Sequence, residues 1–512
     1  MLFNSYEFIF FFLPLSLLVY LALRKYGSRR VSLSWIVAAS LFFYGWWNPA
    51  YLGLILASMF FNYSIGTLLS SNRSHNSRKT ILVIGITANL LLLGYYKYAN
   101  FFVDTINEVF GYSWNFEHII LPLAISFFTF QQITYLVDAY RAETREYNFL
   151  HYALFVSFFP QLIAGPIVHH REMMPQFVML EKKIFNFENI AVGLSIFFLG
   201  LFKKVVVADS LSPYAISAFD VVAGGEVLSF FEAWLGVLAY TFQLYFDFSG
   251  YSDMAVGIAF LFGIRLPLNF NSPYKSGSII EFWQRWHMTL SRFLRDYLYI
   301  PLGGNRKGLP RRYINLMLTM LLGGLWHGAG WTFVVWGGLH GIYLVINHGW
   351  RSIKEVLGIR QTGSAIARML SQSLTFFSVA LAWVYFRADS LDAANLMVKS
   401  LFGYGGVIWP EEAKGQLGAF ADILPSLGVQ FQFQEHFNGL DHILLVVSLL
   451  LVVWLAPNIH QVFYKNTAVI DPPQPVRLSW RPDFKWATAI TVIAVVSLLK
   501  LGQVSEFLYF QF

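Results

Sequence analysis

Residues 320–341 read MLLGGLWHGAGWTFVVWGGLHG, two apolar stretches joined by a glycine-rich break with a histidine at the break. The two stretches predict a pair of membrane-spanning helices that enclose His327. An ionisable side chain inside a membrane segment is costly, so it is a functional-site hypothesis by default. Histidine also moves protons readily near neutral pH. His327 is therefore the first candidate for a functional residue.

The whole chain shares the apolar character of this stretch. Apolar residues make up 56% of its 512 residues and charged residues only 13%, whereas soluble domains carry about 25% charged residues. About eleven apolar windows are long enough, or nearly so, for membrane spans of about 20 residues. We therefore predict an all-α, polytopic membrane protein in which one membrane domain covers residues 1–512.

The distribution of charge predicts the orientation of the spans. The formal net charge of +7 does not indicate nucleic-acid binding, because the basic residues cluster in short loops, as in the positive-inside pattern. The first apolar run, 7–23, ends in RKYGSRR rather than in a small-residue cleavage site, which predicts a retained first span. Counting crossings between basic loops places both termini outside.

Two regions interrupt the regular spans. Residues 150–168 contain two prolines and a glycine and precede HHRE, which predicts a broken or re-entrant helix followed by solvated His169 and His170. The charge-dense stretch 270–312, which contains His287, predicts amphipathic or partly inserted helices at the cytoplasmic face. Further spans are expected near 187–204, 228–247, 252–268, 366–386, 439–457 and 484–502, with an external loop at 387–438.

Four long motifs occur in the order QLIAGPIVHHRE (161–172), YFDFSGYSDMAVGIA (245–259), FWQRWHMTLSRFLRDYLYIPLGGN (282–305) and WHGAGWTFVVWGGLHG (326–341). Together they resemble the membrane-bound O-acyltransferases, and within that family the bacterial alginate O-acetyltransferase branch. The resemblance runs nearly end to end. Several long motifs in one order are specific, whereas a lone WHG would not be. The loop around 400–438 looks less typical of the branch.

This resemblance implies a ring of about eleven transmembrane helices, with re-entrant and amphipathic helices, around a cytoplasmic funnel for acyl-CoA. The catalytic core would cover about 118–350. His327 would be the catalytic histidine, and His287 matches the family's second signature position, which is often asparagine in other branches. The resemblance also implies a bacterial inner-membrane enzyme with periplasmic termini, surrounded by lipid. Acetyl-CoA would be its donor, no cofactor would stay bound, and a periplasmic acetyltransferase partner would complete transfer to a polysaccharide such as alginate.

The expected chemistry suits the residue types present. Acyl transfer to an alcohol needs a base for the hydroxyl proton, which a neutral His327 can provide, and a donor to the oxyanion, which His287 can provide. Phosphates of acetyl-CoA would be bound by cationic side chains. The candidates for substrate binding are Arg285, Arg295, Arg306, Lys307 and Trp326. The tryptophans of this region are also suited to anchoring at the membrane interface.

The terminal FLYFQF allows two interpretations. A similar aromatic motif occurs on a small partner protein in related systems that attach D-alanine to teichoic acids, where its tyrosine is a proposed acyl carrier. Tyr509 would then take the acetyl group and pass it outward. The alternative is an aromatic belt at the outer interface.

Other interpretations stay open at this point. Peptidoglycan or another exopolysaccharide is an alternative acceptor, and a transporter would also carry intramembrane histidines, although no inverted repeat is evident. His340 suits helix packing beside small residues, and Asp247 and Asp253 suit structural polar pairing. The chain has no cysteine, and its histidines show no regular ligand spacing, so no metal site is predicted.

Overall fold

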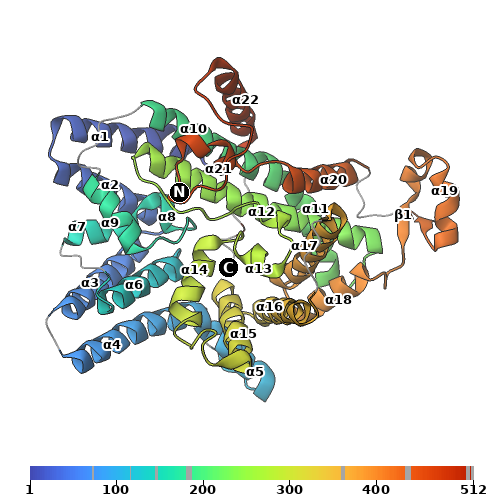
Figure 1. Ribbon diagram of the computed structural model, residues 1–512, viewed down its shortest axis with the longest axis horizontal. Coiled ribbons are helices and arrows are strands. Elements are labelled where there is room, and N and C mark those ends of the chain that lie inside the picture. The colour runs from blue at the N-terminus through green and yellow to red at the C-terminus, as the bar shows by residue number, and fades with distance from the viewer. Residues whose placement is uncertain are drawn as a thin grey trace. The chain divides into compact units, whose positions relative to one another are not determined.

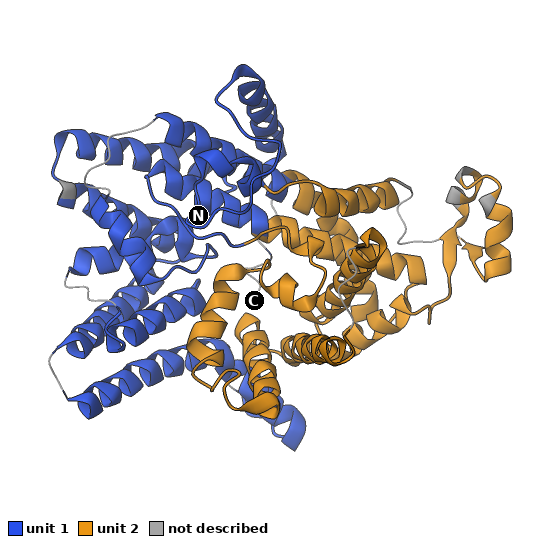
Figure 2. Ribbon diagram, viewed as in Figure 1, with its two compact units in different colours: residues 1–205, 249–269, 459–511 blue, residues 206–248, 270–458, 512 orange. Residues whose placement is uncertain are grey.

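The computed structural model describes residues 1–71, 74–115, 117–143, 148–179, 187–358, 364–432, 440–502 and 508. Helices make up most of this part of the chain, as predicted (Figure 1). The described strands are β1 (Ile408–Pro410) and β2 (Gln430–Gln432), which pair in parallel. The chain divides into two compact units, residues 1–205, 249–269 and 459–511, and residues 206–248, 270–458 and 512 (Figure 2).

The first unit is built mainly from the N-terminal helices. Its elements are a π turn at Phe8–Phe12, α1 (Leu13–Tyr26), α2 (Arg29–Gly45), α3 (Ala50–Ser70), α4 (His75–Leu93), a π turn at Gly94–Tyr98, α5 (Ala99–Phe110), α6 (Ile125–Tyr140), α7 (Phe149–Ser157), α8 (Phe159–Leu162), α9 (His170–Met179), α10 (Phe187–Phe202), α21 (Ile459–Val462), a 3-10 turn at Tyr464–Asn466 and α22 (Phe484–Lys500). A π turn at Lys203–Ala208 continues α10.

The second unit holds the region around His327. Its elements are α11 (Asp209–Ala223), a 3-10 turn at Pro273–Lys275, α13 (Ile279–Trp283), α14 (Met288–Leu294), a π turn at Arg295–Tyr299, α15 (Gly308–His327), α16 (Trp331–Val356), α17 (Ala365–Arg387), α18 (Leu391–Leu401), 3-10 turns at Glu411–Gln416 and Leu424–Leu427, α19 (Phe420–Ile423) and α20 (Leu440–Leu455), together with β1 and β2. The helix α12 (Phe230–Leu261) contributes residues to both units.

Several helices are long and apolar enough to cross a membrane. Within the described residues, five helical segments meet both requirements, namely Phe8–Tyr26, Ala50–Ser70, His75–Phe110, Phe187–Ala223 and Ala365–Arg387. Shorter apolar helices occupy Arg30–Gly45 and Asp441–Leu455. These segments support a multi-pass membrane protein. The ring of about eleven spans and the cytoplasmic funnel remain predictions.

The expected break near residue 160 is present, but the two histidines after it are not solvated. The chain forms α7, then the single turn α8, and resumes as α9 at His170. His169 and His170 are 1% and 2% exposed, and the ring of His170 lies against Tyr135 and Phe155. The prediction of solvation was wrong because the broken segment folds back into its unit, which local charge in the sequence does not show.

The expected pair of spans at 228–247 and 252–268 is instead the continuous helix α12, which ends at Leu261. Its glycines permit close packing and do not break the helix. A Cβ atom on Gly250 would lie 2.7 Å from the carbonyl oxygen of Gly200, and one on Gly257 would lie 2.6 Å from that of Gly193. Small residues therefore allow α10 and α12 to approach closely.

The hairpin of α15 and α16 packs by the same principle and positions His327. A Cβ atom on Gly337 would lie 2.3 Å from the carbonyl oxygen of Met320, and one on Gly324 would lie 2.3 Å from that of Phe333. At the break, a Cβ atom on Gly328 would lie 2.1 Å from the Phe333 ring. Glycine is therefore needed both along the helix contact and in the short connection between the two helices.

Candidate active site

His327 is the last residue of α15, and Gly328 follows it as the helix cap in extended conformation. The side chain is buried, with 6% of its surface exposed. Its ring lies 4.8 Å from that of Trp326, 5.0 Å from that of Trp336 and 5.3 Å from that of Phe386, measured between centroids. The imidazole therefore stands among aromatic rings at the break predicted from the sequence.

His287 immediately precedes α14 and has a left-handed backbone conformation, with φ 41° and ψ 52°. This conformation costs a residue other than glycine roughly 1–3 kcal/mol, and such residues cluster at functional sites. Asparagine tolerates this conformation better than most residues. The family resemblance implies an asparagine at this position in other branches, and asparagine would suit the same backbone conformation.

The structure brings the two predicted catalytic histidines together. Their ring centroids are 6.4 Å apart, with the ring planes inclined at 60°. Trp326 contributes to the same cluster, with its ring centroid 6.3 Å from that of His287. Phe248 packs edge-on against His287 at 4.8 Å. Three candidate residues from two separate sequence motifs thus meet in one buried cluster.

The environment of His287 favours the neutral form of its imidazole. His287 is fully buried, and desolvation lowers its pKa to about 3. His287 is therefore uncharged near neutral pH and has one ring N–H to donate and one ring nitrogen to accept. Among the residues that the structure describes, no group of three or more His, Asp or Glu side chains has the arrangement of a metal site.

A second layer of aromatic residues was not predicted. Trp336 lies between His327 and His340, with its ring centroid 5.0 Å from each. Trp283 donates from its indole nitrogen to Nδ1 of His340 at 3.3 Å, which is in line with a packing role for that histidine. Trp336 lies in the same motif as His327 and could have been chosen for that reason. Phe386 lies on α17 and has no local sequence signal.

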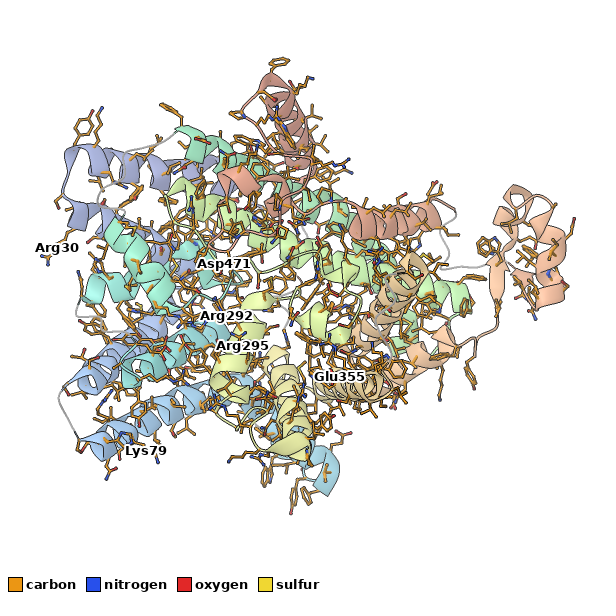
Figure 3. The ribbon with its side chains drawn as sticks, viewed as in Figure 1. Arg30, Lys79, Arg292, Arg295, Glu355 and Asp471 are labelled. Atoms are coloured by element: carbon orange, nitrogen blue, oxygen red, sulfur yellow. The ribbon has the colours of Figure 1, made fainter. Side chains whose placement is uncertain are left out.

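The candidate phosphate-binding arginines are partly neutralised. Arg285 forms an ion pair with Glu281 at 2.8 Å and donates to the carbonyl oxygen of Asn271 at 3.3 Å. Arg295, labelled in Figure 3, makes two contacts with the carboxylate of Asp296, at 2.7 and 3.1 Å. Each of these two cations therefore already has a carboxylate partner.

Arg306 and Lys307 have a different setting. Both side chains are exposed, in the turn that precedes α15. Gly303 and Gly304 shape this turn with φ values of 111° and 54°, and the buried Asn315 donates to the carbonyl oxygen of Gly304 at 2.9 Å. The turn is thus anchored while its two cations face outward.

Two further predictions concern residues outside this cluster. Asp253 pairs with Lys203 at 2.6 Å and accepts a hydrogen bond from His460 at 2.9 Å, which confirms its structural polar pairing. Asp247 is buried, at 1% exposed. Tyr509 lies outside the described residues, so the acyl-carrier hypothesis stays a prediction.

Comparison with known proteins identifies the family. Residues 137–362 match the membrane-bound O-acyltransferase family. A peptidoglycan O-acetyltransferase from Helicobacter pylori is 47% identical over 433 residues, covering 80% of this chain and 81% of that protein. A probable alginate O-acetylase AlgI from Pseudomonas putida is 38% identical over 529 residues and covers both chains fully. A teichoic acid D-alanyltransferase from Bacillus subtilis is 31% identical over 44% of this chain and 59% of that protein. The resemblance seen in the motifs is thereby confirmed, and this O-acyltransferase belongs to the membrane-bound O-acyltransferase family.

Proposed function

We propose that the protein takes an acetyl group from cytoplasmic acetyl-CoA and delivers it for O-acetylation of an exported polysaccharide. The observation that carries this proposal is the buried pair of His287 and His327, whose ring centroids are 6.4 Å apart at the break between α15 and α16. A base must reach the hydroxyl proton directly or through one water, and we expect a bound acceptor hydroxyl to lie within that reach of His327.

His327 acts as the general base in this proposal. As the acceptor hydroxyl attacks the thioester carbonyl, a ring nitrogen of His327 takes the hydroxyl proton. The C–O bond forms, the C–S bond breaks, and the imidazolium returns its proton to the departing CoA thiolate. Because His327 is the last residue of α15, the negative end of the helix dipole stabilises the transient imidazolium.

His287 supports the reaction by donating a hydrogen bond. Its neutral imidazole carries one N–H, which would stabilise the negative charge that develops on the carbonyl oxygen. The aromatic residues around both histidines exclude water and so strengthen this interaction. In this proposal, the strained left-handed backbone of His287 positions its ring to donate to the carbonyl oxygen.

Similarity to known proteins supports the proposed acceptor. Relatives named as alginate O-acetylases and as a peptidoglycan O-acetyltransferase cover most or all of this chain. We favour an exopolysaccharide such as alginate, with peptidoglycan as the second candidate because of the 47% identical Helicobacter pylori protein. A periplasmic acetyltransferase partner would complete the transfer to the polymer. This protein would lie in the inner membrane with both termini in the periplasm. Residues 1–512 would form one catalytic membrane domain.

Two parts of the proposal concern how the acetyl group enters and leaves. The exposed Arg306 and Lys307 suit binding of donor phosphates better than Arg285 and Arg295, which already pair with carboxylates. Tyr509 would receive the acetyl group as a phenyl ester and release it outward. A Tyr509→Phe protein that retains full polymer acetylation in vivo would remove this carrier.

The experiment that tests the proposal is mass spectrometry of O-acetyl groups on the exported polymers of cells. Wild type is compared with a deletion and with His327→Ala at matched membrane abundance. We expect one polymer to lose its O-acetyl groups in both mutants. Retention of acetylation in His327→Ala would contradict the catalytic role, and unchanged polymers in the deletion would contradict the proposed function.

A further inference from the structure

The end of the α15–α16 hairpin opposite His327 carries a contact that the proposed reaction does not use. Arg312, on α15, places its Nη2 atom 2.6 Å from Nδ1 and 3.3 Å from Nε2 of His348, on α16. A guanidinium group has donors only, so the imidazole accepts the hydrogen bond. His348 is therefore neutral in this contact, and Arg312 keeps its full positive charge.

Other basic side chains add to this charge. Arg351 lies one helical turn after His348, and its charge acts on the same ring as that of Arg312. Arg311 and Lys354 lie on the same two helices. Glu355, labelled in Figure 3, forms no ion pair with them within the part of the chain that the structure describes.

Arg312 contrasts directly with two other arginines of this unit. Arg285 and Arg295 each have a carboxylate within ion-pair distance. Arg312 has instead a neutral ring that holds its guanidinium in place without cancelling its charge. A planar guanidinium held in this way is prepared for a bidentate contact with a phosphate. Its orientation is already fixed, so less side-chain entropy is lost on binding.

We infer that Arg312, oriented by His348 and assisted by Arg351, binds a phosphate ester at the basic end of the α15–α16 hairpin. The phosphate can belong to the nucleotide end of an acyl-CoA or to an anionic lipid headgroup. The acyl-CoA source rests on the proposed function. Arg312 and His327 are fifteen residues apart on α15, about 22 Å along the helix axis. A pantetheine chain separates the phosphates of CoA from its thioester by a length of this order.

The binding experiment uses the full chain in nanodiscs of phosphatidylcholine, with CoA and 3′-dephospho-CoA as probes. Arg312→Gln is compared with Arg368→Gln, which removes an exposed arginine from the start of α17. We expect Arg312→Gln to weaken CoA binding about tenfold, as the loss of a charge-assisted hydrogen bond does. A smaller effect on 3′-dephospho-CoA would identify the 3′-phosphate as the bound group. Arg312→Lys should recover only part of the affinity, because an ammonium lacks the fork geometry.

A second measurement distinguishes the lipid source. In nanodiscs that also contain phosphatidylglycerol, native mass spectrometry reports the anionic lipids retained by each variant. Loss of retained phosphatidylglycerol in Arg312→Gln, with CoA affinity unchanged, would assign the site to a lipid headgroup. Equal CoA affinity and equal lipid retention in Arg312→Gln and Arg368→Gln would overturn the inference.

The role of His348 has its own readout. His348→Phe keeps a ring on α16 but cannot accept from Arg312, so in an acyl-CoA site the variant should raise KM for the donor and leave kcat nearly unchanged. A fall in kcat alone would contradict positioning of a phosphate. His327→Ala separates this inference from the proposed function, since it should strongly reduce acetyl transfer and retain CoA binding. If CoA binds through Arg312 but no assay detects acetyl transfer, the inferred phosphate site is supported and the proposed function is contradicted.

Discussion

Two buried histidine clusters of this protein have opposite chemical surroundings. In the second unit, His287 and His327 lie among the rings of Phe248, Trp326 and Trp336. In the first unit, His460 donates to Asp253, which also pairs with Lys203. Burial among aromatic rings disfavours the charged form of His287, whereas His460 donates to a carboxylate that also pairs with a lysine. Burial of a histidine alone therefore does not distinguish a catalytic site from a structural one.

Removal of the proposed base should produce the largest effect. His327→Ala is expected to reduce acetyl transfer by about 10²–10⁴-fold, the contribution of a positioned acid–base group. The glycine contacts between α15 and α16 do not involve the imidazole, so the folded protein should accumulate normally. Acetyl transfer per folded molecule is the measurement, with the exposed His118→Ala as the control. Equal activity in the two variants would place the base elsewhere.

The carboxylate-centred cluster should respond in stability instead. Asp253→Asn leaves Lys203 and His460 without their shared carboxylate, and we expect a loss of about 3 kcal/mol, as for other broken buried ion pairs. Thermal unfolding in detergent measures this loss, with the exposed Asp220→Asn as the control. Activity per folded molecule should change little. A selective loss of activity without loss of stability would make this cluster a second functional site.

The pH dependence of stability should sharpen the comparison further. Burial lowers the pKa of His287 to about 3, whereas an unfolded histidine titrates near 6.5. The unfolded chain therefore binds more protons between these values. The contribution of His287 to stability is complete above about pH 6.5 and falls as the pH drops toward 3, by about 2 kcal/mol at pH 5.

His287→Asn provides the test of this dependence. Asparagine does not titrate and tolerates the left-handed backbone, so the variant should lose less thermal stability than wild type between pH 7 and pH 5. An identical loss in both proteins would show that His287 is not buried as a neutral ring. The side-chain amide of asparagine can also donate a hydrogen bond, so this variant should keep part of its acetyl transfer if His287 acts as a donor to the oxyanion.

The smallest effect is expected at the hydrogen bond between Trp283 and His340. Trp283→Phe removes the donor and keeps most of the ring, which should cost about 1 kcal/mol of stability. Acetyl transfer should stay close to the wild-type rate, because His340 packs behind Trp336. A loss of activity as large as that of His327→Ala would make His340 part of the catalytic group.

The sequence predicted the local features of the site well. The apolar runs and the glycine break predicted the end of one helix at His327 and the start of the next, and α15 and α16 have these limits. Prolines and glycine predicted the break between α7 and α9. The boundary expected between the spans 228–247 and 252–268 was wrong, because α12 continues through it. A glycine that permits close packing looks the same in sequence as one that ends a helix.

By itself, the sequence determined the class of the protein and its principal candidate residue. Composition and hydrophobic run length depend only on the order of residues along the chain, and they were sufficient for an all-α membrane protein with a histidine at a helix break. Only the tertiary structure decided which side chains meet. It placed His287 beside His327, buried His169 and His170, and distinguished the arginines held by carboxylates from Arg312, which is held by a neutral ring. Burial and charge pairing depend on contacts between distant segments, which the periodicity of any one segment cannot show.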